Sequence, residues 1–309
     1  MHHNRPSIGL VLSGGGARGL AHIGILRVLE REGILVDYLA GTSMGGVIAA
    51  GYAAGMNSYD LEREALAVTQ KRSMLRLADP DLSRGGLIRG QRVFDFYKRE
   101  FGDKTFSDLP LQLAVVAVDL KSHQEVVLQE GSVALALRAT TSLPGIFTPI
   151  EINGQQLVDG GLLNNLPVDI AKKMGAEIVI AVNLGLTNNE GIGQWIGNHR
   201  WIPGGIANTL EVFDNCLYAM RVVEQEKKLC QFPPDVLICP ELPKNINSVA
   251  GYSKVEELVS AGERAIEEHL TEIKALLRPR WHWTLNRKTI GVDKSMVQSS
   301  FSSANSENN

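Results

Sequence analysis

Short apolar runs alternate with glycine-rich turns and helical patterns in the first half of the chain, and this alternation restricts the possible folds more than any other feature. The first run, residues 8–12, leads through a glycine-rich loop into leucines and isoleucines at helical spacing, which stop at Gly33. A second run, residues 36–40, precedes a helical stretch at 45–56. Such alternation places parallel strands in one sheet with helices on its faces. The pattern predicts an α/β fold, a three-layer α/β/α sandwich with a mostly parallel central sheet.

Apolar runs and helical spacing also predict the later strands and helices. Helices are expected at residues 58–70, 92–101, 134–141, 169–174 and 254–277, and strands at 113–119, 125–129, 156–158, 177–183 and 236–239. An apolar helical stripe of Ile206, Leu210, Phe213, Leu217 and Met220 is expected to face the core rather than a membrane. The glycine- and tryptophan-rich segment 187–205 is open to three interpretations: a mobile flap, an interfacial patch or an ordinary packed loop.

These elements divide the chain into four parts. Residues 1–7 form an N-terminal extension, residues 8–184 the α/β core, residues 185–290 a helical and strand completion of the same domain, and residues 291–309 a tail expected to be disordered. The chain of 309 residues, 44% of them hydrophobic, is long enough to bury a large core. A formal net charge of −3 supplies no basic field for nucleic acid, so we expect no nucleic-acid partner.

Composition also limits location and cofactors. Cys216, Cys230 and Cys239 lack the spacing of a metal pair, and we expect them to be reduced, buried packing residues. No apolar stretch approaches the roughly 20 residues that span a bilayer, and the first residues do not resemble a signal peptide. The sequence therefore predicts a cytoplasmic protein without a metal, with peripheral contact to the inner face of the membrane left open. The oligomeric partner stays unknown.

The pentapeptide Gly41-Thr42-Ser43-Met44-Gly45 separates the second apolar run from the second helical stretch. A strand–Gly-x-Ser-x-Gly–helix sequence is typical of a nucleophile elbow, a tight turn that raises a serine hydroxyl above the end of a sheet. Gly41 and Gly45 would let strand and helix approach closely. An ordinary strand–helix turn has the same composition, so the motif alone makes Ser43 a candidate only.

A second motif lies between the first strand and the first helix. Gly14, Gly15 and Gly16, followed by Arg18 and Gly19, could direct backbone N–H groups toward the oxygen that becomes negative during acyl transfer. The segment also matches the dinucleotide-binding pattern G-x-G-x-x-G, which requires an acidic residue at the end of the next strand. That strand ends in Ala40-Gly41 instead, so nucleotide binding is the weaker interpretation.

A third motif, Asp159-Gly160-Gly161, follows the short strand at 156–158. Asp-Gly is a common turn, but a serine nucleophile also needs a base to take its proton. The seven histidines are poorly placed for that task, since they lie at the terminus, inside helices, in a turn or outside the α/β core. An aspartate held against Ser43 is the simpler base.

Taken together, these motifs make the sequence similar to the patatin-like phospholipase family, in particular to its bacterial members related to neuropathy target esterase. The similarity covers residues 8–184 and includes Arg89-Gly90 and the segment 138–145. Many relatives have alanine where this chain has Gly161. The resemblance implies a Ser–Asp dyad without histidine. Ser43 would be the nucleophile, Asp159 the base, and Gly14, Gly15, Gly16 and Arg18 the oxyanion-hole region.

The resemblance also implies a reaction class. Ser43 would attack an ester carbonyl, Asp159 would accept its proton, and water would release the acid from an acyl-enzyme without any cofactor. A phospholipid, a lysophospholipid or a related lipid ester is the expected substrate. Two other interpretations stay open: an acyltransferase that passes the acyl group to an alcohol or thiol, and a regulatory or scaffolding protein with little turnover.

Overall fold

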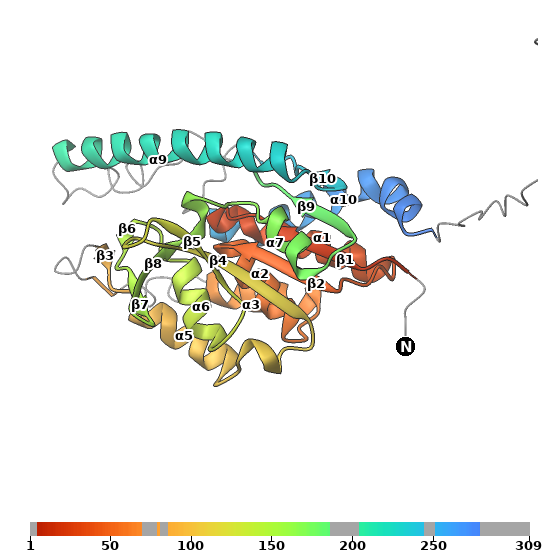
Figure 1. Ribbon diagram of the computed structural model, residues 1–309, viewed down its shortest axis with the longest axis horizontal. Helices are drawn as coiled ribbons and strands as arrows, with labels where there is room; N and C mark the ends of the chain where they lie inside the picture. The colour runs from red at the N-terminus through yellow and green to blue at the C-terminus, as the bar shows by residue number, and fades with distance from the viewer. Residues whose placement is uncertain (1–4, 70–78, 81–85, 186–203, 244–250, 279–309) are drawn as a thin grey trace, which may run out of the picture. The chain divides into compact units, whose positions relative to one another are not determined.

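A computed structural model of the chain describes residues 5–69, 79–80, 86–185, 204–243 and 251–278 (Figure 1). The strands are β1 (Ile8–Leu12), β2 (Tyr38–Thr42), β3 (Gly86–Ile88), β4 (Gln112–Asp119), β5 (Gln124–Leu128), β6 (Gly145–Phe147), β7 (Ile150–Ile152), β8 (Gln155–Asp159), β9 (Ile178–Val182) and β10 (Val236–Ile238). The α-helices are α1 (Ala21–Arg31), α2 (Met44–Ala53), α3 (Ser58–Thr69), α5 (Gln91–Phe101), α6 (Val133–Thr140), α7 (Val168–Met174), α9 (Gly204–Gln231) and α10 (Val255–Leu276). Short 3-10 helices are η1 (Gly16–Leu20), η2 (Phe106–Asp108), η3 (Gly160–Leu162) and η4 (Gly251–Ser253).

The central sheet has eight strands, ordered β10-β9-β1-β2-β4-β8-β7, with β5 also paired to β4. From β10 to β4 all neighbours are parallel, whereas β5 and β8 run antiparallel to β4. The expected mostly parallel sheet is therefore confirmed. Strand β10 pairs with β9, so residues beyond 185 contribute to the same sheet. The four-part division of the chain stays a prediction, and its tail lies outside the described residues.

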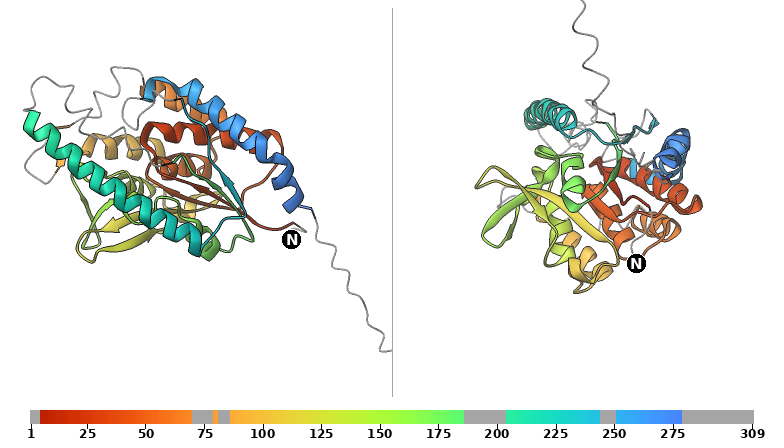
Figure 2. Two further views of the ribbon diagram at one scale, coloured as in Figure 1. Left: turned by 90° about the horizontal axis from the view of Figure 1, so that it is seen from above. Right: turned by 45° about the vertical axis from the view of Figure 1, so that its right-hand side comes forward.

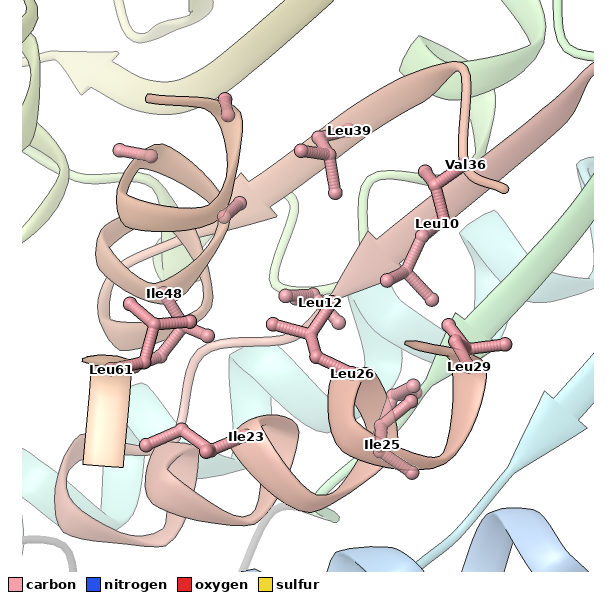
Figure 3. Close-up of a cluster of buried hydrophobic side chains, with 14 of the residues drawn as sticks. Leu10, Leu12, Ile23, Ile25, Leu26, Leu29, Val36, Leu39, Ile48 and Leu61 are labelled. Atoms are coloured by element: carbon pink, nitrogen blue, oxygen red, sulfur yellow. The ribbon is translucent and has the colours of Figure 1, made fainter. Parts of the chain in front are cut away.

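Side chains alternate between the two faces of the sheet and pack against a helical layer on each. Leu10 and Leu12 of β1 join Leu39 of β2 in a core with α1, α2 and α10, as Figure 3 shows for α1 and α2. Val11, between the two leucines, faces the opposite layer, where it packs with residues of α7. This alternation is the period of a strand buried on both faces. The three-layer α/β/α arrangement is confirmed.

Strand β4 brings two strands end to end. Strand β5 pairs along residues 115–119 of β4, so β2 and β8 must share the other edge. Thr42, the last residue of β2, pairs with Val116, and Asp159, the last residue of β8, pairs with the next residue, Ala117. Because β8 runs opposite to β2, the carboxyl ends of the two strands face each other.

Two differences from the sequence expectation concern short strands. Strand β2 begins at Tyr38 and includes Gly41 and Thr42, two residues later than the apolar run suggested, because Val36 is buried without pairing in the ladder. Strands β3, β6 and β7 were not expected. Each has three residues, too few to show a period. Strands β6 and β3 form a separate two-stranded sheet.

In helix α9, the expectation of a core-facing apolar stripe is wrong for Met220. Met220 is 65% exposed, Leu217 is half-buried, and the side chains of the other three stripe residues lie outside the described ones. Cys216, Cys230 and Cys239 are likewise exposed free thiols rather than packing residues. The glycine- and tryptophan-rich segment 187–205 lies almost entirely outside the described residues.

Helices α1 and α10 touch at two glycines, and this contact yields a stability prediction. A Cβ at Gly24 would lie well under 3.0 Å from the carbonyl oxygen of Val259, and one at Gly262 would collide with that of Ala21. Gly24→Ala is therefore expected to lower the free energy of unfolding by about 1–3 kcal/mol, although alanine otherwise favours a helix. Urea denaturation measures the change. Thr271→Ala, on the exposed side of α10, is the control. An unchanged midpoint for Gly24→Ala would contradict the close helix contact.

Candidate active site

Ser43 occupies the turn between β2 and α2. Its backbone has φ 53° and ψ −126°, a conformation that costs a non-glycine residue free energy and that is enriched at functional sites. Neighbouring glycines make the turn sterically possible, because a Cβ at Gly45 would collide with the carbonyl oxygens of Leu12 and Ser13. A Cβ at Gly41 would lie 2.7 Å from the backbone of Gly45. The half-buried serine side chain thus stands at the carboxyl edge of the sheet.

Asp159 meets Ser43 across the junction of β2 and β8. The Ser43 side chain is close enough to the Asp159 carboxylate to lower its pKa, and the carboxylate accepts the backbone N–H of Gly161 at 2.8 Å. Gly160 lies against β4, where a Cβ would overlap the carbonyl oxygen of Val116. The structure therefore brings together two residues that stand far apart in the chain.

Burial changes the acidity of Asp159. The side chain is only 5% exposed, and this desolvation raises its pKa to about 6 from an ordinary value of 3.8. The Ser43 side chain, the hydrogen bond from Gly161 and the positive charge of Arg221 on α9 oppose that rise. The carboxylate is therefore ionised at neutral pH but is a stronger base than an exposed aspartate.

The glycine loop lies beside Ser43, as a Cβ at Gly14 would stand 3.2 Å from the serine Cβ. The Gly14 backbone N–H is already donated to the carbonyl oxygen of Asn165 at 3.2 Å. Gly15 precedes η1, and Gly16 begins it with a positive φ of 55°. Arg18 is buried, and its Nε donates to the carbonyl oxygen of Gly15 at 3.4 Å, which braces the loop.

The end of α6 holds both candidate residues, a role that the sequence did not reveal. The Thr140 hydroxyl donates to the carbonyl oxygen of Val116 at 2.6 Å and accepts the backbone N–H of Ser43 at 2.9 Å. Two residues further on, the carbonyl oxygen of Ser142 accepts the backbone N–H of Asp159 at 3.0 Å. Both contacts join segments far apart in the chain, so no local pattern announces them.

No hydrogen bond joins a histidine to Ser43 or Asp159 in the part of the chain that the structure describes. His22 is fully buried in α1, and its Nε2 lies 2.9 Å from the carbonyl oxygen of Ser13, beside the glycine loop. Burial lowers the pKa of His22 to about 4, so the imidazole is neutral at pH 7 and donates to that oxygen. Asp37 precedes β2 at its amino end and pairs with Arg5 at 2.7 Å, so it does not supply the acidic residue that the dinucleotide-binding pattern requires at the end of this strand.

Arg138 is a buried cation that fastens three segments near the site. Its guanidinium donates to the carbonyl oxygens of Arg89, Gly90 and Thr148 at 2.8–2.9 Å, and also to the Ser142 hydroxyl. The side chain is 3% exposed, and burial lowers its pKa. Because Ser142 binds Asp159, this clamp supports the carboxylate indirectly.

Arg138→Met is expected to lower the free energy of unfolding by about 3–5 kcal/mol, because buried carbonyl oxygens would lose their donors. Arg138→Lys should be less damaging, since lysine keeps the charge but lacks the planar fork. Urea denaturation of both variants checks that Arg138→Met is less stable than Arg138→Lys. Arg99→Met removes a guanidinium whose side chain is 69% exposed and serves as the control. Equal stability of Arg138→Met and wild type would exclude the clamp.

Within the described ranges, no group of three or more His, Cys, Asp or Glu side chains could hold a metal ion. Likewise, none of the helices described is long and apolar enough to cross a membrane.

The fold and the site define an α/β protein that carries a serine at a strand–helix elbow. The chain matches the sequence profile of the family described as Patatin-like phospholipase over residues 10–172, and it belongs to this family. The resemblance derived from the three motifs is thereby confirmed.

Individual relatives agree with this assignment. An uncharacterized NTE family protein of Mycobacterium bovis is 37% identical over 179 residues, which cover 58% of this chain and 49% of that protein. Lysophospholipase NTE1 of Yarrowia lipolytica is 30% identical over 282 residues, which cover 87% of this chain and 20% of that protein. The chain thus spans about half the length, or less, of these relatives.

Solved structures show weaker similarity. VipD from Legionella pneumophila aligns with a TM-score of 0.48 and 14% identity, covering 84% of this chain and 67% of VipD. Human GIVD cytosolic phospholipase A2 aligns with a TM-score of 0.46 and 11% identity, covering 89% of this chain and 59% of the human chain.

Proposed function

We propose that the protein is a serine hydrolase of lipid esters that uses Ser43 as nucleophile and Asp159 as general base. The observation that carries this proposal is the meeting of Ser43 with the buried Asp159 carboxylate at the junction of β2 and β8, where burial raises the pKa of Asp159 to about 6. A base is most effective when its pKa approaches the working pH. The burial of Asp159 thus supplies part of what a histidine provides in other serine hydrolases.

Acylation would begin with nucleophilic attack and end with departure of the alcohol. The Ser43 oxygen attacks the ester carbonyl while its proton passes to Asp159. The negative charge on the carbonyl oxygen is stabilised by backbone N–H groups of the glycine loop. Because the Gly14 N–H binds Asn165, we assign this task to Gly15 and Gly16, with Arg18 bracing the loop. The proton on Asp159 then moves to the departing alcohol, which leaves an acyl-enzyme.

Deacylation would use the same groups in the reverse order. Asp159 accepts a proton from water as the water oxygen attacks the acyl carbonyl, and the proton returns to Ser43 when the acid leaves. The serine hydroxyl and the ionised carboxylate are restored at the end of each turnover. The scheme requires no metal and no organic cofactor.

The substrate follows from the family rather than from the pair of residues. A phospholipid or lysophospholipid is the proposed class, and the name of the yeast relative, a lysophospholipase, supports it. A single-chain lipid ester and a diacyl lipid would present the same carbonyl to Ser43.

Labelling with a fluorophosphonate tests the proposal directly. The reagent should modify Ser43 in the native protein, and peptide mapping by mass spectrometry identifies the site. A panel of esters of increasing chain length then defines the acyl preference, with products compared in the presence and absence of an alcohol acceptor. An acyl ester as the main product would identify a transferase. Absence of both labelling and turnover would overturn the proposed hydrolase.

A further inference from the structure

Helix α9 presents a polar face to the rest of the protein. Gln225 donates to the Asn183 side chain and accepts from the Asn165 side chain, both at 3.2 Å. Lys228 forms ion pairs with Glu125 at 2.5 Å and with Asp169 at 3.6 Å. Residues 225 and 228 share one side of the helix with Arg221, whose charge acts on Asp159. The side of α9 that faces the candidate active site is therefore charged and hydrogen-bonded.

The opposite side of α9 is apolar and exposed. Val212 is 63% exposed, Met220 65% and Val223 64%, and Cys216 and Ala219 lie on the same side. We call Val212, Cys216, Ala219, Met220 and Val223 the outer stripe. Between 212 and 223, the exposed residues whose side chains are described also include Asn215, and none of the six carries a charge.

This distribution reverses that of a helix on the surface of a globular protein, which turns its apolar side inward. In Figures 1 and 2, no described helix or strand lies over the side of α9 that faces away from the sheet. The polar inner face already has its partners. Covering the outer stripe would therefore remove more apolar surface from water than covering the polar inner face of α9.

The size of the outer stripe favours a membrane over a second copy of the chain. A stable protein interface buries roughly 800 Å² on each partner. Three large side chains about two-thirds exposed, with a cysteine and an alanine, supply much less. An interfacial helix, in contrast, needs only to insert one apolar side about 5–10 Å into the boundary between headgroups and acyl chains. An uncharged stripe enters this boundary without the cost of desolvating an ion.

We propose that the outer stripe docks α9 on the surface of a phospholipid bilayer. The helix would lie in the plane of the interface, with the inner face that carries Arg221 turned toward the protein. A helix is about 10–12 Å thick with its side chains, so docking would hold the candidate active site close to its lipid. This use of the surface rests on the proposed function, whereas the docking itself does not require catalysis.

Flotation with neutral phosphatidylcholine vesicles tests the docking. The full chain should float with the vesicles, equally at low and high salt because the outer stripe is uncharged. Val212→Ser, Met220→Ser and Val223→Ser in one variant should lower the vesicle partition coefficient at least about tenfold. Leu35→Ser with Leu276→Ser removes exposed leucines elsewhere and should float like wild type. A polarity-sensitive dye on Cys216, in a Cys230→Ser, Cys239→Ser background, should shift its emission to the blue when vesicles are added.

Three results would overturn docking: no flotation of the wild type, equal flotation of the triple-serine variant, or a wild-type dimer that this variant converts to a monomer without altered flotation. Hydrolysis of a soluble short-chain ester separates the two proposals. Unchanged ester turnover in a variant that no longer floats assigns the outer stripe to docking and confirms that the variant is folded. Flotation by a wild type that hydrolyses no ester would remove the proposed function and leave docking in place.

Discussion

Ser43→Ala is expected to lower kcat/KM for ester hydrolysis by at least about 10³-fold, because alanine cannot form the acyl-enzyme. Fluorophosphonate labelling should disappear at the same time. The substitution removes a hydroxyl at a half-buried position and leaves the elbow backbone to the neighbouring glycines, so the fold should persist. Circular dichroism and thermal unfolding check that the loss of activity is not a loss of structure.

The chain offers a matched control for this variant. In the turn after β4, the Ser122 hydroxyl donates to the Asp119 carboxylate at 2.7 Å, which makes a second Ser–Asp pair. Hydrogen bonds lower the pKa of Asp119 to about 2, opposite to the change at Asp159, and the pair lies outside the candidate site. Ser122→Ala should therefore hydrolyse esters at the wild-type rate. Full activity in Ser43→Ala, or its loss in Ser122→Ala, would reject Ser43 as the nucleophile.

Asp159→Asn is expected to lower kcat/KM by about 10²–10⁴-fold, because an amide cannot accept the serine proton. In the wild type, activity should fall below a pH of about 6, roughly tenfold per pH unit, as Asp159 becomes protonated. A profile of kcat/KM from pH 4 to 8 on a soluble ester measures this limb. An acid limb near pH 4, or none at all, would exclude the buried carboxylate as the base.

The same variant should change stability in a direction that depends on pH. The pKa of Asp159 is 3.8 when exposed and about 6 when folded, so its contribution to stability is fully present below pH 3.8 and is lost as pH rises through 6. At 1.36 kcal/mol for each pKa unit, the loss at pH 7 is about 3 kcal/mol. Asp159→Asn should therefore be more stable than wild type at pH 7 and no more stable at pH 4.

Urea denaturation at the two pH values measures the difference. Asp103→Asn, at a side chain that is 95% exposed, should show no such gain and serves as the control. A loss of stability in Asp159→Asn at pH 7 would mean that the carboxylate mainly stabilises the fold through its hydrogen bonds.

Much of the fold could be predicted because buried parallel strands have continuous apolar sequences. Strand β1 matches its run of residues, and the other long strands differ from theirs by one or two residues. The hairpin of β7 and β8 was missed although a signal was present. Asn153 and Gly154 both have positive φ in the turn between the strands, and Asn-Gly is a strong indicator of a two-residue hairpin.

Helix α9 shows where periodicity fails. The spacing of apolar residues identifies this segment as a helix, but periodicity does not tell which side of the helix faces the core. The answer depends on partners such as Asn165 and Glu125, which are more than 50 residues away in the chain. Only the folded arrangement reveals that the polar side is the inner one.

The sequence predicted the motifs of the candidate site, but it did not predict the residues and strand pairing that hold these motifs together. Glycine spacing made Ser43 a candidate, and the family resemblance implied Asp159 as its partner. Their meeting depends on β8 running antiparallel along the same edge of β4 as β2, which a prediction of parallel strands does not contain. Thr140 and Ser142 entered only as part of a motif, without a role.

The attachment of Ser43 and Asp159 to the end of α6 has a consequence for thermal motion. The backbone N–H of Ser43 is held by the Thr140 side chain, and that of Asp159 by the Ser142 carbonyl. A shift of this helix end would therefore move the proposed nucleophile and the proposed base together. Their mutual orientation then depends on one shared anchor rather than on two independent ones.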